Sequence, residues 1–120
     1  MKKILFVEDN KMMTDLYKDL LGDKFALVIA ISIVEAEHAF KKHPDISVIV
    51  LDGFVFDNRD SKTPDTSTHE LLKKFKETFK GVIIASSSDP VARKKMILLG
   101  CDHECEKWDV PKKVFEIIGL

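Results

Sequence analysis

Three acidic residues stand directly after short apolar runs, where their side chains are best placed to do chemistry together. Glu8 and Asp9 follow the run 4–7, and Asp52 follows the run 48–51. Short runs rich in Val and Ile are typical of buried parallel strands, and ligands bind beyond the carboxyl ends of such strands. Three carboxylates at one sheet edge repel each other unless a cation or a proton neutralises them. The sequence therefore predicts a hard divalent metal and chemistry on a charged substrate.

A hydroxyl and an ammonium group follow two further runs. Ser86 begins a triple serine after the run 82–85, and Lys107 follows a weaker, polar strand pattern at 103–106. Together with the acids, these groups suit phosphoryl transfer to a carboxylate. Asp52 is then the nucleophile that forms an acyl phosphate, while Lys107 and Ser86 bind the remaining charge. A cation held by the first two acids bridges the carboxylate and phosphoryl oxygens.

Strand and helix patterns alternate along the chain and position these groups. We expect strands over residues 4–7, 25–31, 46–51, 82–85 and 103–106. Helices fill the intervals, and the first has one apolar face made of Met12, Met13, Leu16, Tyr17, Leu20 and Leu21. This alternation predicts an α/β fold, a doubly wound five-stranded parallel sheet flanked by five helices, in a single domain over residues 1–120.

Local signals mark the ends of the helices and one interruption between them. Capping residues precede four helices: Asn10, Ser32, Asp89 (followed by proline) and Asp109. Residues 53–68 break the alternation, because Gly, Asn, Asp, Ser, Thr and Pro dominate there. We predict a long loop over this segment, and loops of such length in compact domains are usually functional or mobile.

Composition and charge exclude several function classes. The net charge is −1 and the basic residues lie in scattered pairs, so we expect no nucleic-acid contact. The longest apolar stretch, 25–34, is about half the length that spans a bilayer, and no signal-peptide core follows the N-terminus, so we expect a cytoplasmic protein without membrane contact. Cys101 and Cys105 are spaced as C-x3-C, which fits neither a disulfide scaffold nor the usual zinc or redox pair. We expect reduced thiols.

Over its whole length the sequence resembles the receiver domain of two-component response regulators. Residues 4–10, Ile-Leu-Phe-Val-Glu-Asp-Asn, look like the first strand of that family with its acidic pair. The resemblance implies that Asp9 binds Mg²⁺ directly and that Glu8 binds it largely through water. It also implies that Asp52 is the phosphorylated aspartate and that the backbone carbonyl of Phe54 is a further metal ligand.

Two more positions complete the resemblance and its functional meaning. Ser86 matches the family's switch hydroxyl, and residues 100–107 look like its Gly-Ala-Asp approach to a functional lysine, here Lys107. The implied fold is flavodoxin-like, with strand order 2-1-3-4-5. The implied function is that of a stand-alone receiver that accepts a phosphoryl group on Asp52, in a Mg²⁺-dependent reaction, from a histidine kinase or a histidine phosphotransfer protein. Such a domain signals rather than acting as an enzyme, and catalyses only its own phosphorylation and dephosphorylation.

Signalling by partner contact is the expected output. The expected surface for an unknown downstream protein is the face built from the helix after Asp89, the strand 103–106 and the helix after Asp109. The sequence also leaves homodimer formation as an alternative. The alternative is a degenerate receiver that serves as a phosphorylation-independent interaction module. A flavodoxin is disfavoured because the first strand does not lead into a phosphate-binding loop. A haloacid-dehalogenase-type phosphatase is disfavoured because neither Asp9 nor Asp52 belongs to an Asp-x-Asp pair.

Three departures from the family pattern lead to further expectations. In the family a proline usually lies four residues after the phosphorylated aspartate, whereas here Pro64 lies twelve residues after Asp52. About eight residues are therefore inserted, and we hypothesise that they partly cover the site. Lys107 precedes Trp108 instead of a proline, and because a cis bond before a non-proline residue costs about 2.5–4 kcal/mol, we predict a trans bond. Glu104 replaces the aromatic switch residue, so rotation of a ring cannot operate there.

Overall fold

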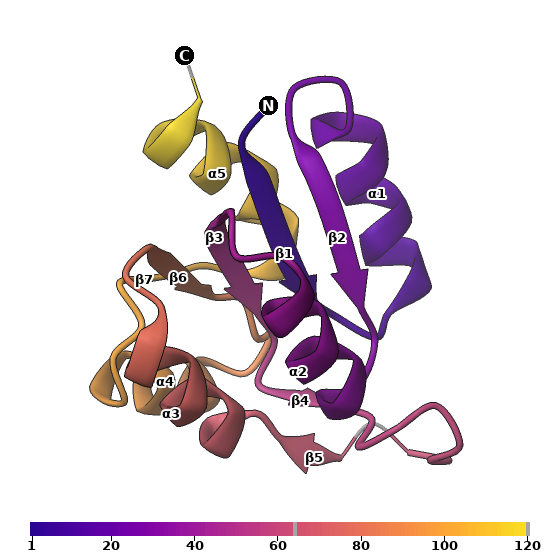
Figure 1. Cartoon of the computed structure of the whole chain (residues 1–120). Helices are drawn as coiled ribbons and strands as arrows, with labels where there is room; N and C mark the ends of the chain where they lie inside the picture. Colours follow the sequence, from indigo (N-terminus) through magenta and orange to yellow (C-terminus); the bar gives the residue numbers. More distant parts are fainter. Residues whose placement is uncertain (64, 120) are drawn as a thin grey trace.

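The computed structural model describes residues 1–63 and 65–119, which form one parallel sheet with helices on both faces (Figure 1). The strands of this sheet are β1 (Lys3–Val7), β2 (Ala26–Ala30), β3 (Ile46–Leu51), β6 (Val82–Ala85) and β7 (His103–Glu104). Their spatial order is β2-β1-β3-β6-β7, which confirms the predicted doubly wound, flavodoxin-like arrangement. The strand order reverses between β1 and β3, so the acids that follow these two strands lie at the switch point.

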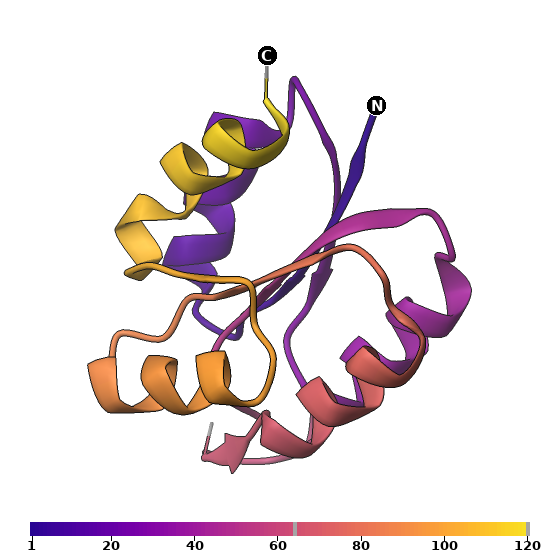
Figure 2. The ribbon, with the colours of Figure 1, turned by 90° about the vertical axis from the view of Figure 1, so that its left-hand side faces the viewer.

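The described residues form five α-helices that cover the sheet. They are α1 (Lys11–Leu21), α2 (Ile33–Lys42), α3 (His69–Thr78), α4 (Pro90–Leu98) and α5 (Val110–Ile118), the last entered through a 3₁₀ turn, η1 (Lys107–Asp109). Helices α1 and α5 pack on one face, and α2, α3 and α4 on the other (Figure 2). The central strands β1, β3 and β6 are mostly buried on both faces and read as nearly continuous apolar runs, whereas the edge strand β7 is short and polar. Within the described chain, no helix is long and apolar enough to cross a membrane.

Three of the four predicted helix caps are confirmed. Asn10, Ser32 and Asp89 each accept a hydrogen bond from a backbone N–H of the following first turn, at 3.2, 3.1 and 2.9 Å. Each bond satisfies an N–H group that has no partner within its helix. Asp109 lies at the start of α5 but its side chain makes no capping bond. Its backbone is already helical after the 3₁₀ turn, whereas a capping residue needs an extended backbone.

The predicted buried face of α1 is correct for one of its two rows of side chains. Met13, Tyr17 and Leu21 are buried, whereas Met12 and Leu20 are 61% and 52% exposed. Side chains four residues apart form the row that faces the sheet, and the neighbouring row points about 100° around the helix. The apolar stripe in the sequence is therefore wider than the surface that the sheet covers.

The prediction of an irregular loop over residues 53–68 is wrong in part. This segment is called the inserted segment below. Its two ends pair with each other as short antiparallel strands, β4 (Phe54–Val55) and β5 (Thr66–Ser67). Val55 is fully buried in the core on the side of α2 and α3, so the apolar residues after Asp52 anchor the hairpin. Two-residue strands leave almost no alternating pattern to read in a sequence.

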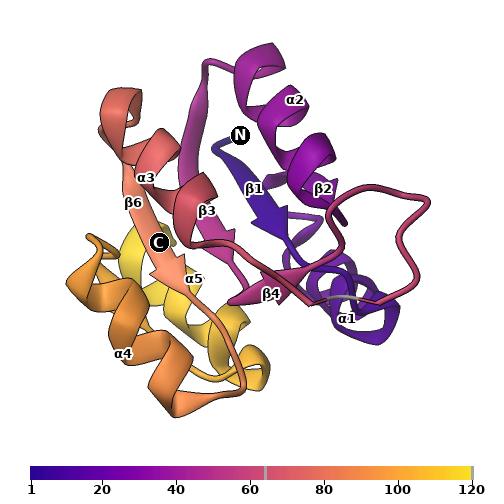
Figure 3. The ribbon, with the colours of Figure 1, turned by 90° about the horizontal axis from the view of Figure 1, so that it is seen from below.

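Beyond β4 the inserted segment is bound to the start of α2. The carbonyls of residues 56 and 57 accept hydrogen bonds from the first two N–H groups of α2, at 2.9 and 3.1 Å. Arg59 Nη2 adds an ion pair with Glu35 Oε1 at 3.1 Å. Figure 3 shows the segment running from β4 along the first turn of α2. None of these contacts involves Glu8, Asp9 or Asp52, so a cover over the site stays a hypothesis. Pro64, on which the count of inserted residues rests, lies outside the described residues.

The two cysteines pack on opposite sides of the sheet. Cys101 belongs to the core under α2, α3 and α4, while Cys105 packs against the core under α1 and α5, and both are free thiols. Burial raises the pKa of Cys101 to about 12 and that of Cys105 to about 11. Because a disulfide or a shared metal needs both sulfurs on one side, the C-x3-C spacing creates no joint site here.

Candidate functional site

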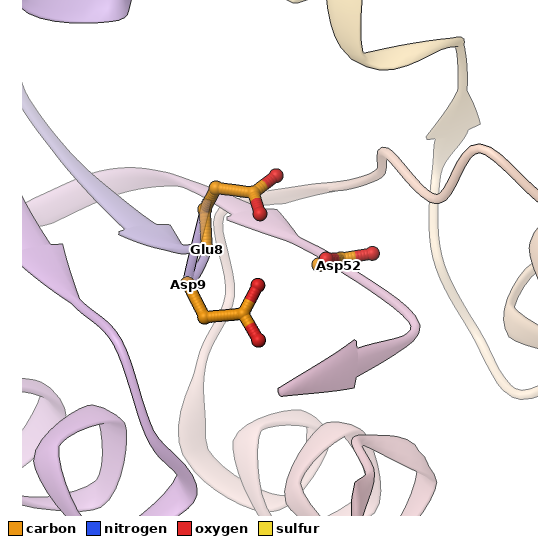
Figure 4. Close-up of side chains that lie close together, drawn as sticks. All are labelled: Glu8, Asp9 and Asp52. Carbon is orange, nitrogen blue, oxygen red and sulfur yellow. The ribbon is translucent and has the colours of Figure 1, made fainter. Parts of the chain in front are cut away.

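The three acids meet at the carboxyl edge of the sheet, as predicted (Figure 4). Glu8 and Asp9 follow β1 and Asp52 follows β3, and one carboxylate oxygen of each lies within 4.8 Å of the others. The strand ladder continues one residue into the site, because the N–H of Glu8 donates to Ala30 and the N–H of Asp52 donates to Val7, both at 3.0 Å. Hydrogen bonds of the sheet itself therefore hold the backbone under these carboxylates. Glu8 and Asp52 are buried and Asp9 is half-buried.

Lys107 joins this cluster from the far end of the chain. Its Nζ donates to Asp52 Oδ2 at 3.0 Å and to Glu8 Oε2 at 3.2 Å. The hydroxyl of Tyr17 donates to the Lys107 carbonyl at 3.0 Å, which fixes the backbone of the lysine against α1. No described peptide bond is cis, so the predicted trans bond between Lys107 and Trp108 is confirmed. The ammonium group reaches two acids from this trans backbone.

Ser86 lies at the same edge of the sheet, and Phe54 lies two residues after Asp52. The N–H of Ser86 donates to the carbonyl of Leu51 at 3.0 Å, which places Ser86 beside the residue that precedes Asp52. Its Oγ is buried and has no hydrogen-bond partner among the described residues. Phe54 is the first residue of β4 and its side chain is exposed. The role of its carbonyl as a metal ligand stays a prediction.

The cluster is short of positive charge, because three carboxylates face one ammonium group. Burial and the neighbouring Asp52 raise the pKa of Glu8 to about 7, although Lys107 opposes the shift. Burial and Asp52 also raise the pKa of Asp9. Burial alone would lower the pKa of Lys107, but Asp52 and Glu8 outweigh it and raise this pKa, so the ammonium stays charged. A further cation would relieve the repulsion among the acids.

The donor set fits a hard divalent cation. Glu8 Oε1 and Asp9 Oδ2 are buried and have no hydrogen-bond partner among the described residues. Buried polar atoms are nearly always paired in native proteins, and carboxylate oxygens are the ligands that Mg²⁺ and Mn²⁺ prefer. Asp52 Oδ1 accepts a hydrogen bond from the N–H of Gly53 at 2.7 Å, and its Oδ2 is bound to Lys107. Glu8 and Asp9 thus offer free oxygens next to an already oriented Asp52.

Thr68 supports the site and is not among the predicted site residues. Its hydroxyl is buried and donates to the carbonyl of Asp52 at 2.6 Å and to that of Gly53 at 3.2 Å. Its N–H also donates to the Gly53 carbonyl, at 3.0 Å. The end of the inserted segment is therefore tied to the backbone of Asp52. A threonine at the end of a polar stretch carries no sequence signal for such a contact.

Thr68→Val is expected to lower the free energy of unfolding by about 1–3 kcal/mol. The change keeps the shape of the side chain but leaves the buried Asp52 carbonyl without its donor, while the Gly53 carbonyl keeps the Thr68 N–H. Urea unfolding measures the change. Thr78→Val, on the exposed end of α3, is the matched control and should stay within about 0.5 kcal/mol of the wild type. Equal stability of the two variants would show that the hydroxyl of Thr68 is not needed to hold the Asp52 backbone.

The comparisons with known proteins agree with this geometry at the level of the fold. No protein-family model and no curated protein matches the sequence. A two-component response regulator from Clostridium difficile superposes with a TM-score of 0.80 at 18% identity, over 98% of this chain and 96% of that one. The BeF₃-activated N-terminal receiver domain of Klebsiella pneumoniae RstA gives 0.77 at 19% identity, over 96% and 93%. The Mn²⁺-bound form of response regulator Rcp1 gives 0.70 at 18% identity, over 98% and 94%. This chain therefore has the fold of CheY-like response regulator receiver domains.

Proposed function

We propose that this chain is a stand-alone receiver whose Asp52 accepts a phosphoryl group from a histidine kinase or a histidine phosphotransfer protein. The observation that carries the proposal is the buried Asp52 carboxylate held at 3.0 Å by Lys107 and grouped with two further acids within 4.8 Å. Burying three carboxylates together costs free energy that one lysine only partly offsets. Ionisable groups are grouped at such a cost mainly at functional sites, where their charges take part in a reaction.

The residues divide the work of phosphoryl transfer among them. Asp52 attacks phosphorus, a P–O bond forms, and the P–N bond to the donor imidazole breaks, which leaves an acyl phosphate. Lys107 already contacts Asp52 and binds a phosphoryl oxygen as the negative charge arrives. The unpaired hydroxyl of Ser86 donates a hydrogen bond to another oxygen. Glu8, Asp9 and Asp52, together with the carbonyl of Phe54, would hold Mg²⁺, which would supply neutralising charge.

Signal output would follow by contact with a downstream protein over the face of α4, β7 and α5, in the cytoplasm. Val91 and Leu98 of α4 are exposed apolar residues, which suits a protein contact. A second candidate function is an interaction module that works without phosphorylation. This alternative is favoured by Glu104, which occupies the position of the aromatic switch residue in the family pattern. Glu104 forms an ion pair with Arg93 at 3.2 Å, so no aromatic ring can rotate there.

Phosphorylation is tested by incubating the protein with acetyl phosphate and MgCl₂ and measuring its intact mass. We expect one added phosphoryl group, which is lost on acid or hydroxylamine treatment as an acyl phosphate is. Asp52→Asn should abolish the modification, because the amide is no nucleophile. Asp57→Asn, an exposed aspartate of the inserted segment, is the matched control and should be modified like the wild type.

Omission of Mg²⁺ should slow the modification strongly, since the site is short of positive charge. If the wild type takes no phosphoryl group from acetyl phosphate, nor from a histidine kinase, the phosphoacceptor function is refuted and the interaction module becomes the better account. Modification that persists in Asp52→Asn would place the reactive group elsewhere.

A further inference from the structure

The guanidinium group of Arg93, on α4, connects the serine loop (residues 86–88), which follows β6 beside the site, to the end of β7. Its Nη1 donates to the carbonyl of Ser87 at 2.7 Å, and its Nε donates to Glu104 Oε1 at 3.2 Å. The Arg93 side chain is only 12% exposed. Hydrogen bonds from a charged donor are stronger than neutral ones, and the planar guanidinium holds two acceptors in a fixed geometry. Arg93 is therefore a rigid bridge rather than a solvated surface charge.

At one end of the bridge, Ser87 packs directly against Gly53, the residue after Asp52. It is buried, and its Oγ accepts a hydrogen bond from the N–H of Asp89 at 3.2 Å. A Cβ atom added at Gly53 would lie 3.1 Å from this Oγ, so the residue after Asp52 and Ser87 are in close contact. Ser87 also follows Ser86 in the chain. A shift of the Ser87 carbonyl would consequently displace the Ser86 hydroxyl relative to Asp52.

At the other end, Glu104 is fixed by the sheet. It pairs with Ala85 in the β6–β7 register, and the N–H of the next residue, Cys105, donates to the Ala85 carbonyl at 3.0 Å. The Glu104 carboxylate therefore has a defined place from which it orients the guanidinium. Without this second contact the long arginine side chain would be held by the Ser87 carbonyl alone.

We propose that Arg93 is a positioning residue for phosphoryl transfer, an inference that rests on the proposed function. Arg93 holds the Ser87 carbonyl so that the adjacent Ser86 hydroxyl stays where a phosphoryl group on Asp52 meets it, and Glu104 orients Arg93. The buried Ser86 Oγ, which has no partner among the described residues, is kept available for the incoming oxygen in this way. The same bridge ties the position of the serine loop to the α4–β7 edge.

The test measures the rate of phosphorylation by acetyl phosphate together with the Kd for Mg²⁺. Arg93→Met should slow phosphorylation by about 10-fold, because the hydroxyl is no longer held in place, while the Kd for Mg²⁺ stays unchanged since the acids are untouched. Arg93→Lys keeps the charge but cannot hold two acceptors in the same geometry. Its phosphorylation rate should therefore lie between that of the wild type and that of Arg93→Met. Lys94→Met, which removes an exposed positive charge next to Arg93, is the matched control and should react like the wild type.

The decisive comparison is made in a Ser86→Ala background. There Arg93→Met should cause no further loss, because Arg93 acts through the hydroxyl that is already absent. Likewise, adding Glu104→Met to Arg93→Met should not slow the reaction more than Arg93→Met alone. An unchanged rate in Arg93→Met, or an equal loss with and without Ser86, overturns the role of Arg93 while leaving the proposed function intact. A wild-type chain that is not phosphorylated at all overturns both.

Discussion

Lys107→Met is expected to lower the free energy of unfolding by about 3–5 kcal/mol in metal-free buffer at neutral pH, because it removes one partner of a buried ion pair. The lysine side chain is 17% exposed and contacts Asp52 and Glu8, whose side chains are 7% and 2% exposed. Its loss leaves three buried or half-buried carboxylates without a cation. Urea unfolding in the presence of EDTA measures the effect.

Mg²⁺ should reverse much of this loss, since an ion that binds only the folded protein stabilises it by mass action. The variant should also bind Mg²⁺ more tightly than the wild type, because the ammonium group no longer competes for Asp52 and Glu8. Adding Asp52→Asn to Lys107→Met should recover part of the stability by removing the carboxylate nearest the missing ammonium.

Lys11→Met is the matched control for this prediction. Lys11 forms an ion pair with Asp15 at 2.8 Å, but its side chain is 87% exposed. An exposed pair contributes little, so the control should change stability by less than about 1 kcal/mol. If Lys107→Met is as stable as Lys11→Met in EDTA, the three acids do not depend on Lys107 and the electrostatic description of the site is wrong.

Glu8→Gln is expected to stabilise the metal-free protein above neutral pH by as much as about 3 kcal/mol. The pKa of Glu8 is raised to about 7 in the folded protein, first by burial and then by Asp52. Because the folded state holds the proton more tightly than the unfolded state, the favourable contribution of Glu8 is present below its ordinary pKa. It is lost as the pH rises through 7. Glutamine is permanently neutral and avoids this loss.

The measurement is the difference in unfolding free energy between wild type and Glu8→Gln across pH 5 to 9, with EDTA and again with excess Mg²⁺. With EDTA the difference should grow with pH up to about neutrality and then level off. With Mg²⁺ its sign should reverse at high pH, since the metal binds the ionised carboxylate. Taking the difference cancels the carboxylates that lie away from the site, because these titrate alike in both proteins. A difference that does not change with pH would contradict the raised pKa of Glu8.

The fold and the acidic cluster are features that the sequence by itself determined. Buried parallel strands need apolar residues at every position, so their runs and ends are visible in a sequence. Side chains that follow such strands share one sheet edge, which is why the sequence alone places Glu8, Asp9 and Asp52 together. Capping residues such as Asn10 and Ser32 are equally local, because they act on the turn that follows them.

Only the tertiary structure decided how these acids are held and linked to the rest of the molecule. Lys107 lies 55 residues from Asp52 and 99 from Glu8, and no periodic pattern encodes a pairing over such distances. The hydroxyl of Thr68, the bridge made by Arg93 and the binding of the inserted segment to α2 are likewise contacts between polar side chains or loop carbonyls. Such contacts depend on the direction of individual groups once the helices and strands have packed. Hydrophobic periodicity records which face of an element is buried, but not which polar group another element brings to it.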